Sequence, residues 1–188
     1  MKDNTESEIQ NFSGHLLIAH PSLKDPNFSK AVVLISAHQE EEGSLGVILN
    51  RPMHTTLGEF NAEYAYGPLS DTPIFTGGPV QTEEMILTAW FWEEDNQVFR
   101  LYFGIDEDKA LEIKMMNPSV DLRAFLGYAG WEKGQLEEEL AEKAWVISQI
   151  ESQVLEDIEG DELWKRVISK VSPELGFLAD LPDDPSLN

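Results

Sequence analysis

The sequence predicts one α+β domain in which a large mixed or antiparallel sheet has helices packed outside it. Its 188 residues suit a single domain. Strand-like apolar runs outnumber helical patterns early in the chain, whereas helical patterns gather late. The sequence has no internal repeat and no regular alternation of strand and helix, which would indicate a parallel sheet. We expect the domain to span residues 13–179, between flexible segments at 1–12 and 180–188.

Three apolar runs predict the first strands. Residues 14–19 form the first run, which stops before Pro21, and residues 45–49 form the third. Residues 31–37 form an unbroken β-branched run, which predicts a strand covered on both faces. Pro21 and Pro26 place a turn between the first two strands, because each proline biases its predecessor to extended geometry.

The middle of the chain predicts a short helix, a strand and a hairpin. Residues 56–59 match a capping box, so a helix should open there. Residues 73–76 predict a strand that leads into the turn at 77–79. Residues 85–91 and 97–103 predict a hairpin joined by an acidic loop.

Helical patterns dominate the last part of the chain. Asp106 is expected to cap a helix whose first turn is acidic, as the helix dipole favours. Residues 135–143 have an apolar stripe at helical spacing and precede a predicted strand at 144–150. Residues 161–171 predict the last helix, and Pro173 should close it.

An unusual run of glycines and aromatic residues covers residues 126–137. It places three glycines in eight positions, interleaved with Tyr128 and Trp131. Glycine permits backbone angles and close approaches that a Cβ forbids, while aromatic side chains bury a large area. We expect the run to fit a strand against the sheet and to turn it into a helix near Gln135. It would face a ligand only if Arg51 and Gly77 lie beside it.

The charge balance restricts the partners. There are 13 Lys and Arg residues against 35 Asp and Glu residues, which gives a net charge of −22. A field of this sign repels phosphate, so neither direct nucleic-acid binding nor association with an anionic membrane is expected. The chain has no cysteine, which excludes disulfides and thiolate sites. With no apolar run long enough to span a bilayer and a polar, acidic start, the sequence predicts a cytoplasmic protein.

Few residues suggest a chemical function. His38 follows a buried strand, where it is either a base or a satisfied loop histidine. Gly77 and Gly78 form either an anion-binding nest of backbone amides or an empty tight turn. Arg51, beside Asn50, could bind a carboxylate or phosphate bidentately, or form a structural ion pair.

Other sites are rejected. The sequence has no P-loop, no dinucleotide-binding glycine motif and no nucleophile elbow. No two histidines have the spacing of a zinc site on a helix, so no metal and no cofactor are expected. We interpret the carboxylates at 137–139 and Glu142 as a solvated helix face.

Several motifs, taken in order, resemble the YqgE/AlgH family, a widespread group of bacterial proteins of uncharacterised function. The matching pieces are Gly14 to Phe28, His38, Gly46 to Pro52, Gly77 to Val80, Leu126 to Glu137, and Ala144-Trp145. The resemblance covers nearly the whole chain and implies a single α+β domain with a curled mixed sheet in a cytosolic protein. One family name is associated with regulation of alginate transcription. This chain departs from the family in Thr88, where a histidine is frequent, and in His20, where an apolar residue is usual.

We therefore carry a main hypothesis and two alternatives. The first is a monomeric, non-enzymatic binding or regulatory domain for an unknown protein or small ligand. Its candidate ligand-binding residues are His38, Asn50, Arg51, Gly77, Gly78, Tyr128 and Trp131. The second is a small-molecule enzyme that uses His38 as base and Arg51 with the Gly77 and Gly78 amides as an anion cradle. The third is an indirect transcriptional regulator that acts through a protein partner.

Overall fold

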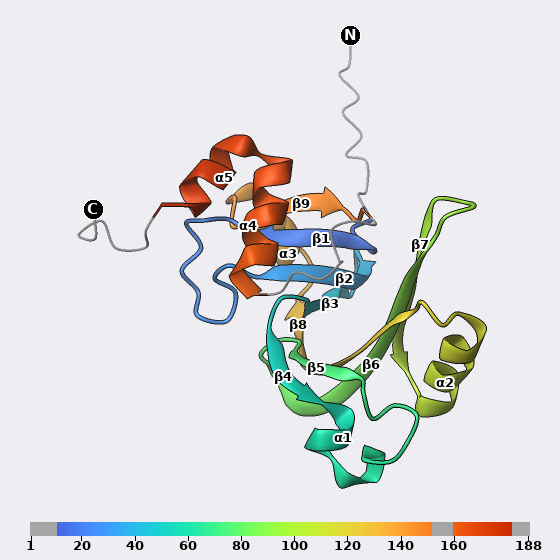
Figure 1. Cartoon of the computed structure of the whole chain (residues 1–188). Coiled ribbons are helices and arrows are strands. Elements are labelled where there is room, and N and C mark those ends of the chain that lie inside the picture. The colour runs from blue at the N-terminus through green and yellow to red at the C-terminus, as the bar shows by residue number, and fades with distance from the viewer. Residues whose placement is uncertain (1–10, 152–159, 182–188) are drawn as a thin grey trace.

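The computed structural model describes residues 11–151 and 160–181. In these ranges a nine-stranded sheet carries five α-helices and one short 3₁₀-helix (Figure 1). The strands are β1 (His15–Ala19), β2 (Val32–Gln39), β3 (Gly43–Ile48), β4 (Pro52–Thr56), β5 (Pro73–Thr76), β6 (Val80–Glu93), β7 (Val98–Ile105), β8 (Asp121–Trp131) and β9 (Trp145–Gln149). The helices are α1 (Leu57–Phe60), η1 (Ala62–Tyr64), α2 (Glu107–Met116), α3 (Gln135–Ala141), α4 (Gly160–Val171) and α5 (Pro173–Ala179).

Strand β8 connects the two parts of the sheet. The main path runs β4-β5-β8-β3-β2-β1-β9, and β6 pairs with both β8 and β7. β5 pairs with β8 in parallel, whereas the other pairings are antiparallel, so the sheet is mixed. In Figure 1, β1, β2, β3 and β9 lie with α3, α4 and α5, and β4 to β7 lie with α1 and α2. This architecture confirms the predicted α+β domain with a large mixed sheet.

The core occupies both faces of β1 and β2. Since successive strand residues point to opposite faces, Leu16 and Ile18 pack with Trp164 of α4, while Leu17 packs on the face covered by α3. Residues 31–35 are likewise fully buried, as expected for a strand covered on both faces. A third cluster, around Leu57, lies beside α1 and α2.

Local signals in the sequence explain the helix starts. The Glu59 carboxylate accepts a hydrogen bond from the Thr56 backbone N–H at 3.0 Å, which is half of the expected capping box. Asp106 accepts from the Lys109 N–H at 2.8 Å and caps α2 as predicted. Helix α3 begins at Gln135, directly after the glycine and aromatic run.

The structure extends the sequence interpretation in three places. β4 follows β3 at Pro52, where no strand was predicted, and β6 begins at Val80 rather than at Met85. Residues 161–171 were predicted as the last helix, but α5 follows it, and Pro173 belongs to this additional helix. It occupies the first turn of α5, with Ser172 as N-cap, because proline lacks only an N–H that a first turn leaves unpaired.

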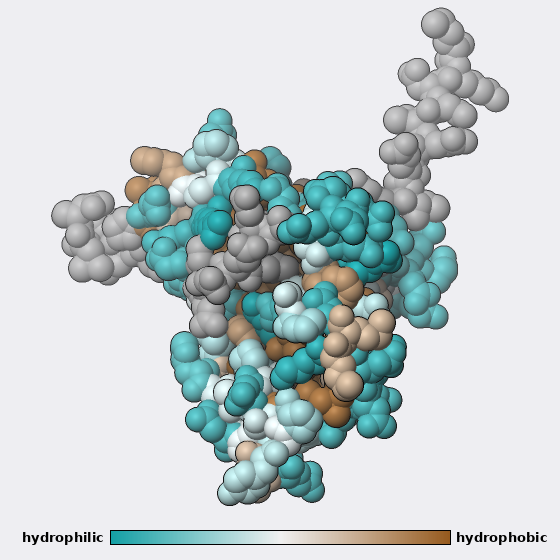
Figure 2. Space-filling model, turned by 45° about the vertical axis from the view of Figure 1, so that its right-hand side comes forward, coloured by the Kyte–Doolittle hydropathy of each residue, from teal (hydrophilic) through white to brown (hydrophobic). Residues whose placement is uncertain are grey.

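Most of the predicted flexible segments, 1–10 and 182–188, lie outside the described residues. Phe12 is buried against the core, with 6% of its surface exposed. Hydrophilic residues cover most of the face in Figure 2, and hydrophobic residues gather mainly in its middle. Within the described ranges, no helix has the length and apolar character that a membrane span requires.

Candidate functional site

His38 is buried on β2 and holds neighbouring elements together. Its Nδ1 lies 2.8 Å from the Ser44 hydroxyl of β3, and its Nε2 lies 3.5 Å from the Glu137 carboxylate of α3. The Phe12 ring packs on the imidazole with a centroid distance of 4.7 Å. Because both ring nitrogens have protein partners, the imidazole joins β2 to β3 and α3.

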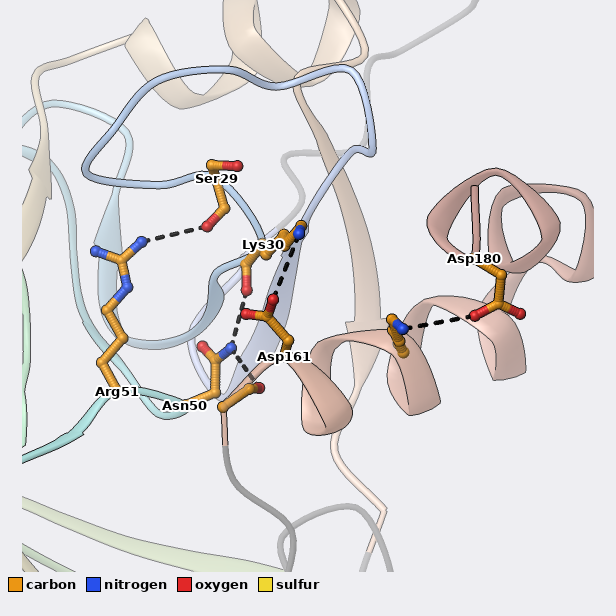
Figure 3. A network of polar contacts seen from close by, with 8 residues as sticks. Ser29, Lys30, Asn50, Arg51, Asp161 and Asp180 are labelled. Atoms are coloured by element: carbon orange, nitrogen blue, oxygen red, sulfur yellow. Dashed lines mark hydrogen bonds and ion pairs between the residues drawn. The ribbon is translucent and has the colours of Figure 1, made fainter. Parts of the chain in front are cut away.

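Asn50, which follows β3, joins three segments (Figure 3). Its Oδ1 accepts from the Val32 N–H at 2.8 Å, and its Nδ2 donates to the Lys30 and Gly160 carbonyl oxygens at 2.8 and 2.9 Å. The side chain is 4% exposed and uses its acceptor and both of its donors within the protein. Asn50 is therefore a structural residue.

Arg51 reaches the loop before β2, the same loop that Asn50 contacts (Figure 3). Its Nη2 donates to the Ser29 carbonyl oxygen at 3.3 Å. Burial lowers the pKa of the Arg51 guanidinium, while the charges of Asp161 and Asp25 act in the opposite direction. These neighbours favour the structural interpretation of Arg51 over an anion site.

Gly77 and Gly78 allow the chain after β5 to lie very close to the backbone of β8. The Gly77 N–H donates to the Leu126 carbonyl oxygen, and the Gly77 carbonyl oxygen accepts from the Ile48 N–H, both at 2.8 Å. A Cβ on Gly78 would lie 2.1 Å from the Tyr128 carbonyl carbon. Since the Gly77 amide already has a partner, it is not free to bind an anion.

The structure separates His38 from the proposed anion cradle. His38 pairs with Ser44 of β3, whereas Gly77 contacts Ile48, four positions further along the same strand. At roughly 3.3 Å per residue, these two points on β3 lie about 13 Å apart. A single small substrate does not bridge that distance, so this geometry argues against the arrangement with His38 as base and Arg51, Gly77 and Gly78 as cradle.

Tyr128 and Trp131, the two remaining candidates, line one surface depression of about 670 Å³. We call it the Tyr128 hollow. Its lining residues come from β2, β3, β6, β8 and the start of α3, and are Ala37, Gln39, 42–45, Val80, Tyr128, 130–132 and Gln135. Of the seven predicted site residues, only these two reach the hollow. The glycine and aromatic run therefore lines it without Arg51 and Gly77, contrary to the expectation that the run faces a ligand only beside those two residues.

Glycines shape the hollow. Gly43 has a φ of +94°, and a Cβ there would lie 2.1 Å from the Trp131 carbonyl oxygen, so the turn between β2 and β3 presses directly on β8. Gly130 is exposed and sits beside the Tyr128 ring, at a distance of 3.4 Å from Cε2 to an ideal Cβ. The missing side chain leaves space beside Cδ2 and Cε2 of the ring, while Tyr128 is half-buried and also packs against the core.

Glu139 holds the indole of Trp131, one of the residues that line the hollow. This role of Glu139 was not predicted from the sequence. One carboxylate oxygen accepts from the indole N–H groups of Trp131 and Trp145 at 2.9 and 2.7 Å. The other oxygen accepts from Gln135 at 2.8 Å. The carboxylates at 137–139 are therefore not one solvated face, since Glu137 also faces His38. The sequence could have indicated this role, because a buried tryptophan usually needs a hydrogen-bond acceptor for its indole N–H group.

The hollow has a negative lining. Glu42 and Glu132 contribute two carboxylates, and no Lys, Arg or His is found among the described residues that line it. The nearest basic residue in the sequence, Lys133, pairs with Glu41 instead. Among residues 11–151 and 160–181, no cluster of three or more His, Asp or Glu residues has the geometry to hold a metal ion.

Comparison with known proteins places this fold among relatives. The sequence profile described as AlgH-like matches residues 16–176. A UPF0301 protein of Streptomyces coelicolor is 38% identical, over 97% of this chain and 98% of the relative, and one of Bacteroides fragilis is 34% identical, over 93% and 90%.

Two solved structures have a similar fold. The AlgH protein from Pseudomonas aeruginosa matches with a TM-score of 0.63 and 27% identity, over 98% of this chain and all of that one. DIP2367 from Corynebacterium diphtheriae matches in fold with a TM-score of 0.70 and 22% identity, over 92% and 93%. None of these names states a substrate, a ligand or a partner.

Proposed function

The chain belongs to the AlgH-like family. We propose that it is a non-enzymatic binding domain whose ligand occupies the Tyr128 hollow. The observation that carries the proposal is the convergence of Tyr128, Gly130 and Gln135, all from the glycine and aromatic run, with the β2–β3 turn around one depression. Its volume of about 670 Å³ lies within the range of ligand pockets, about 300–1,000 Å³.

The hollow is preorganised. Trp131 is 5% exposed, and its indole is fixed by Glu139, which Gln135 also contacts. The Gln135 Oε1 accepts from the Glu132 N–H at 3.0 Å, which ties the loop before α3 to the helix. A wall held in this way does not have to be ordered when a ligand binds, which favours affinity.

The chemistry around His38 argues against an enzyme. Ser44, His38 and Glu137 form a row of hydroxyl, imidazole and carboxylate, which is the order of groups in a serine hydrolase. However, Ser44 is only 7% exposed although it lines the hollow, and its hydroxyl contacts His38, which is covered by Phe12. Activation of a nucleophile requires a substrate within reach of it.

A fragment screen followed by NMR tests the binding function. The backbone amides of the full chain are recorded while cationic, neutral and anionic fragments are added as separate sets. We expect at least one set to shift the signals of Gly43, Gly130 and Gln135. Replacement Gly130→Leu fills the hollow from an exposed strand position and should abolish these shifts.

Gly67→Leu is the matched control, because a Cβ at Gly67 meets only the Tyr64 carbonyl oxygen at 3.7 Å. The control should bind the fragments as the natural chain does. Shifts that persist in Gly130→Leu, or that occur only away from the hollow, would contradict the proposal.

A further inference from the structure

We propose that the Tyr128 hollow binds a basic segment of a protein partner, with a Lys or Arg side chain held against Tyr128 between Glu42 and Glu132. This inference rests on the binding function proposed above and names its ligand class. It is carried by three observations: the charges of the hollow, the half-buried tyrosine ring beside Gly130 and the exposed amide side chain of Gln39.

The two carboxylates favour a cation. Both Glu42 and Glu132 are exposed, and none of the ion pairs formed within residues 11–151 and 160–181 includes either side chain. Lys133 and Glu41, their sequence neighbours, already pair with each other. An anionic ligand in the hollow would meet two negative charges and no positive one.

The tyrosine ring also favours a cationic ligand. A cation over an aromatic face within about 6 Å of its centroid is attracted by the ring electrons. The absence of a side chain at Gly130 leaves space for a cationic group beside Cδ2 and Cε2 of the Tyr128 ring. Carboxylates and an aromatic face together are a common surrounding for guanidinium and ammonium groups.

The remaining features favour a polypeptide over a small cation. Gln39 lines the hollow with an exposed amide, which can donate to and accept from a peptide backbone. The hollow is open and spans parts of four strands and the start of a helix, so it admits more than one side chain. The net charge of −22 also accelerates the approach of a partner with several positive charges.

Peptide titrations test the inference. A short peptide of Arg, Lys and Gly, a matched peptide with Glu at the basic positions, and spermine are titrated into the full chain by calorimetry and NMR at physiological salt. We expect the basic peptide to bind at least tenfold more tightly than either of the other two and to shift the Gly43, Gly130 and Gln135 amides.

The variant Glu42→Gln/Glu132→Gln should weaken binding of the basic peptide about fivefold, because exposed ion pairs contribute modestly. Glu94→Gln/Asp95→Asn, on the exposed β6–β7 loop, removes the same charge elsewhere and should have little effect. Equal effects of the two variants would show that only the net charge attracts the peptide, and would overturn the inference.

The other outcomes separate the two proposals. Equal binding of spermine and the basic peptide would overturn the choice of a polypeptide. If the acidic peptide, or neutral fragments, shift the hollow amides as strongly as the basic peptide, the hollow remains a ligand site but the ligand class is wrong. If no probe of any charge shifts these amides, the binding function itself fails.

Discussion

Asn50 and Gly160 are 110 positions apart in the sequence and are joined by a hydrogen bond of 2.9 Å from the Asn50 Nδ2 to the Gly160 carbonyl oxygen. The same amide donates to Lys30 and accepts from Val32. One side chain thus fixes the start of β2, the end of β3 and the start of α4 (Figure 3). It anchors the helix that covers one face of the core.

Replacement Asn50→Asp should destabilise the protein by about 2–4 kcal/mol. The carboxylate keeps the acceptor for Val32 but cannot donate to two carbonyl oxygens, and it places a charge in a buried position. Urea denaturation followed by circular dichroism measures the loss. Asn11→Asp is the control, because Asn11 only accepts from the Ser13 N–H at an exposed site. A loss equal to that of the control would contradict the structural role of Asn50.

Gly78→Ala should cost about 4 kcal/mol or more, or prevent folding. The added Cβ would lie 2.1 Å from the Tyr128 carbonyl carbon, and two backbones would have to separate. Gly67→Ala adds the same group in an ordinary contact and should change the free energy of unfolding by less than about 0.5 kcal/mol. The yield of folded protein and the urea midpoint test both. A stable Gly78→Ala variant would show that the backbones at Gly78 and Tyr128 are less closely packed than the structure indicates.

Local signals in the sequence were sufficient to predict most of the strands and helices. The unbroken run before Ser36 and the N-cap at Asp106 each depend on neighbours within a few residues, and both predictions are confirmed. β4 was missed because its residues, 52–56, are mostly polar and pair with β5 alone. Pro173 is compatible with both the end of one helix and the start of the next.

The candidate site was harder to predict because its residues meet through strand pairing. The sequence places His38 and Gly77 on two loops, and only the register along β3 shows that they are far apart. Glu139 looked solvated because it stands in a run of carboxylates. Its partners, Trp131 and Trp145, lie on different strands, and their position follows from the sheet.

Glu139→Leu should destabilise the protein by about 2–4 kcal/mol. It leaves two part-buried indole N–H groups without their acceptor, and each unpaired donor costs about 1–3 kcal/mol. Tryptophan fluorescence during urea denaturation reports both stability and the surroundings of the indoles. Glu138→Leu, at the exposed neighbouring position, should have a small effect. Similar losses in the two variants would show that the indoles find other partners.

Fluorophosphonate probes, which react with activated serine hydroxyls, should not label Ser44. Ser44 lines the hollow, but it is only 7% exposed and its hydroxyl contacts His38, which disfavours attack on an incoming phosphorus atom. Intact-mass spectrometry checks for the adduct, with Ser44→Ala as the control for labelling elsewhere. An adduct in the natural chain that disappears in Ser44→Ala would support a serine enzyme and contradict the binding function.

Tyr64 should make stability depend on alkaline pH. Its hydroxyl donates to the Glu107 carboxylate at 2.6 Å and joins η1 to α2. This hydrogen bond, with some burial, raises the pKa of Tyr64 from 10.0 to about 12. Because the folded state holds the phenolic proton more tightly, the stabilisation is complete below pH 10 and is lost as the pH rises toward 12.

Ultraviolet absorbance of tyrosinate and urea midpoints across this pH range measure the effect. Tyr64→Phe should be less stable than the natural chain below pH 10, and the difference should shrink toward pH 12 as the natural chain loses the hydrogen bond. Glu107→Gln should lower the Tyr64 pKa, since the carboxylate is its largest cause. Tyr66→Phe, at a fully exposed ring, is the control. A stability difference that does not change with pH would contradict the Tyr64–Glu107 hydrogen bond.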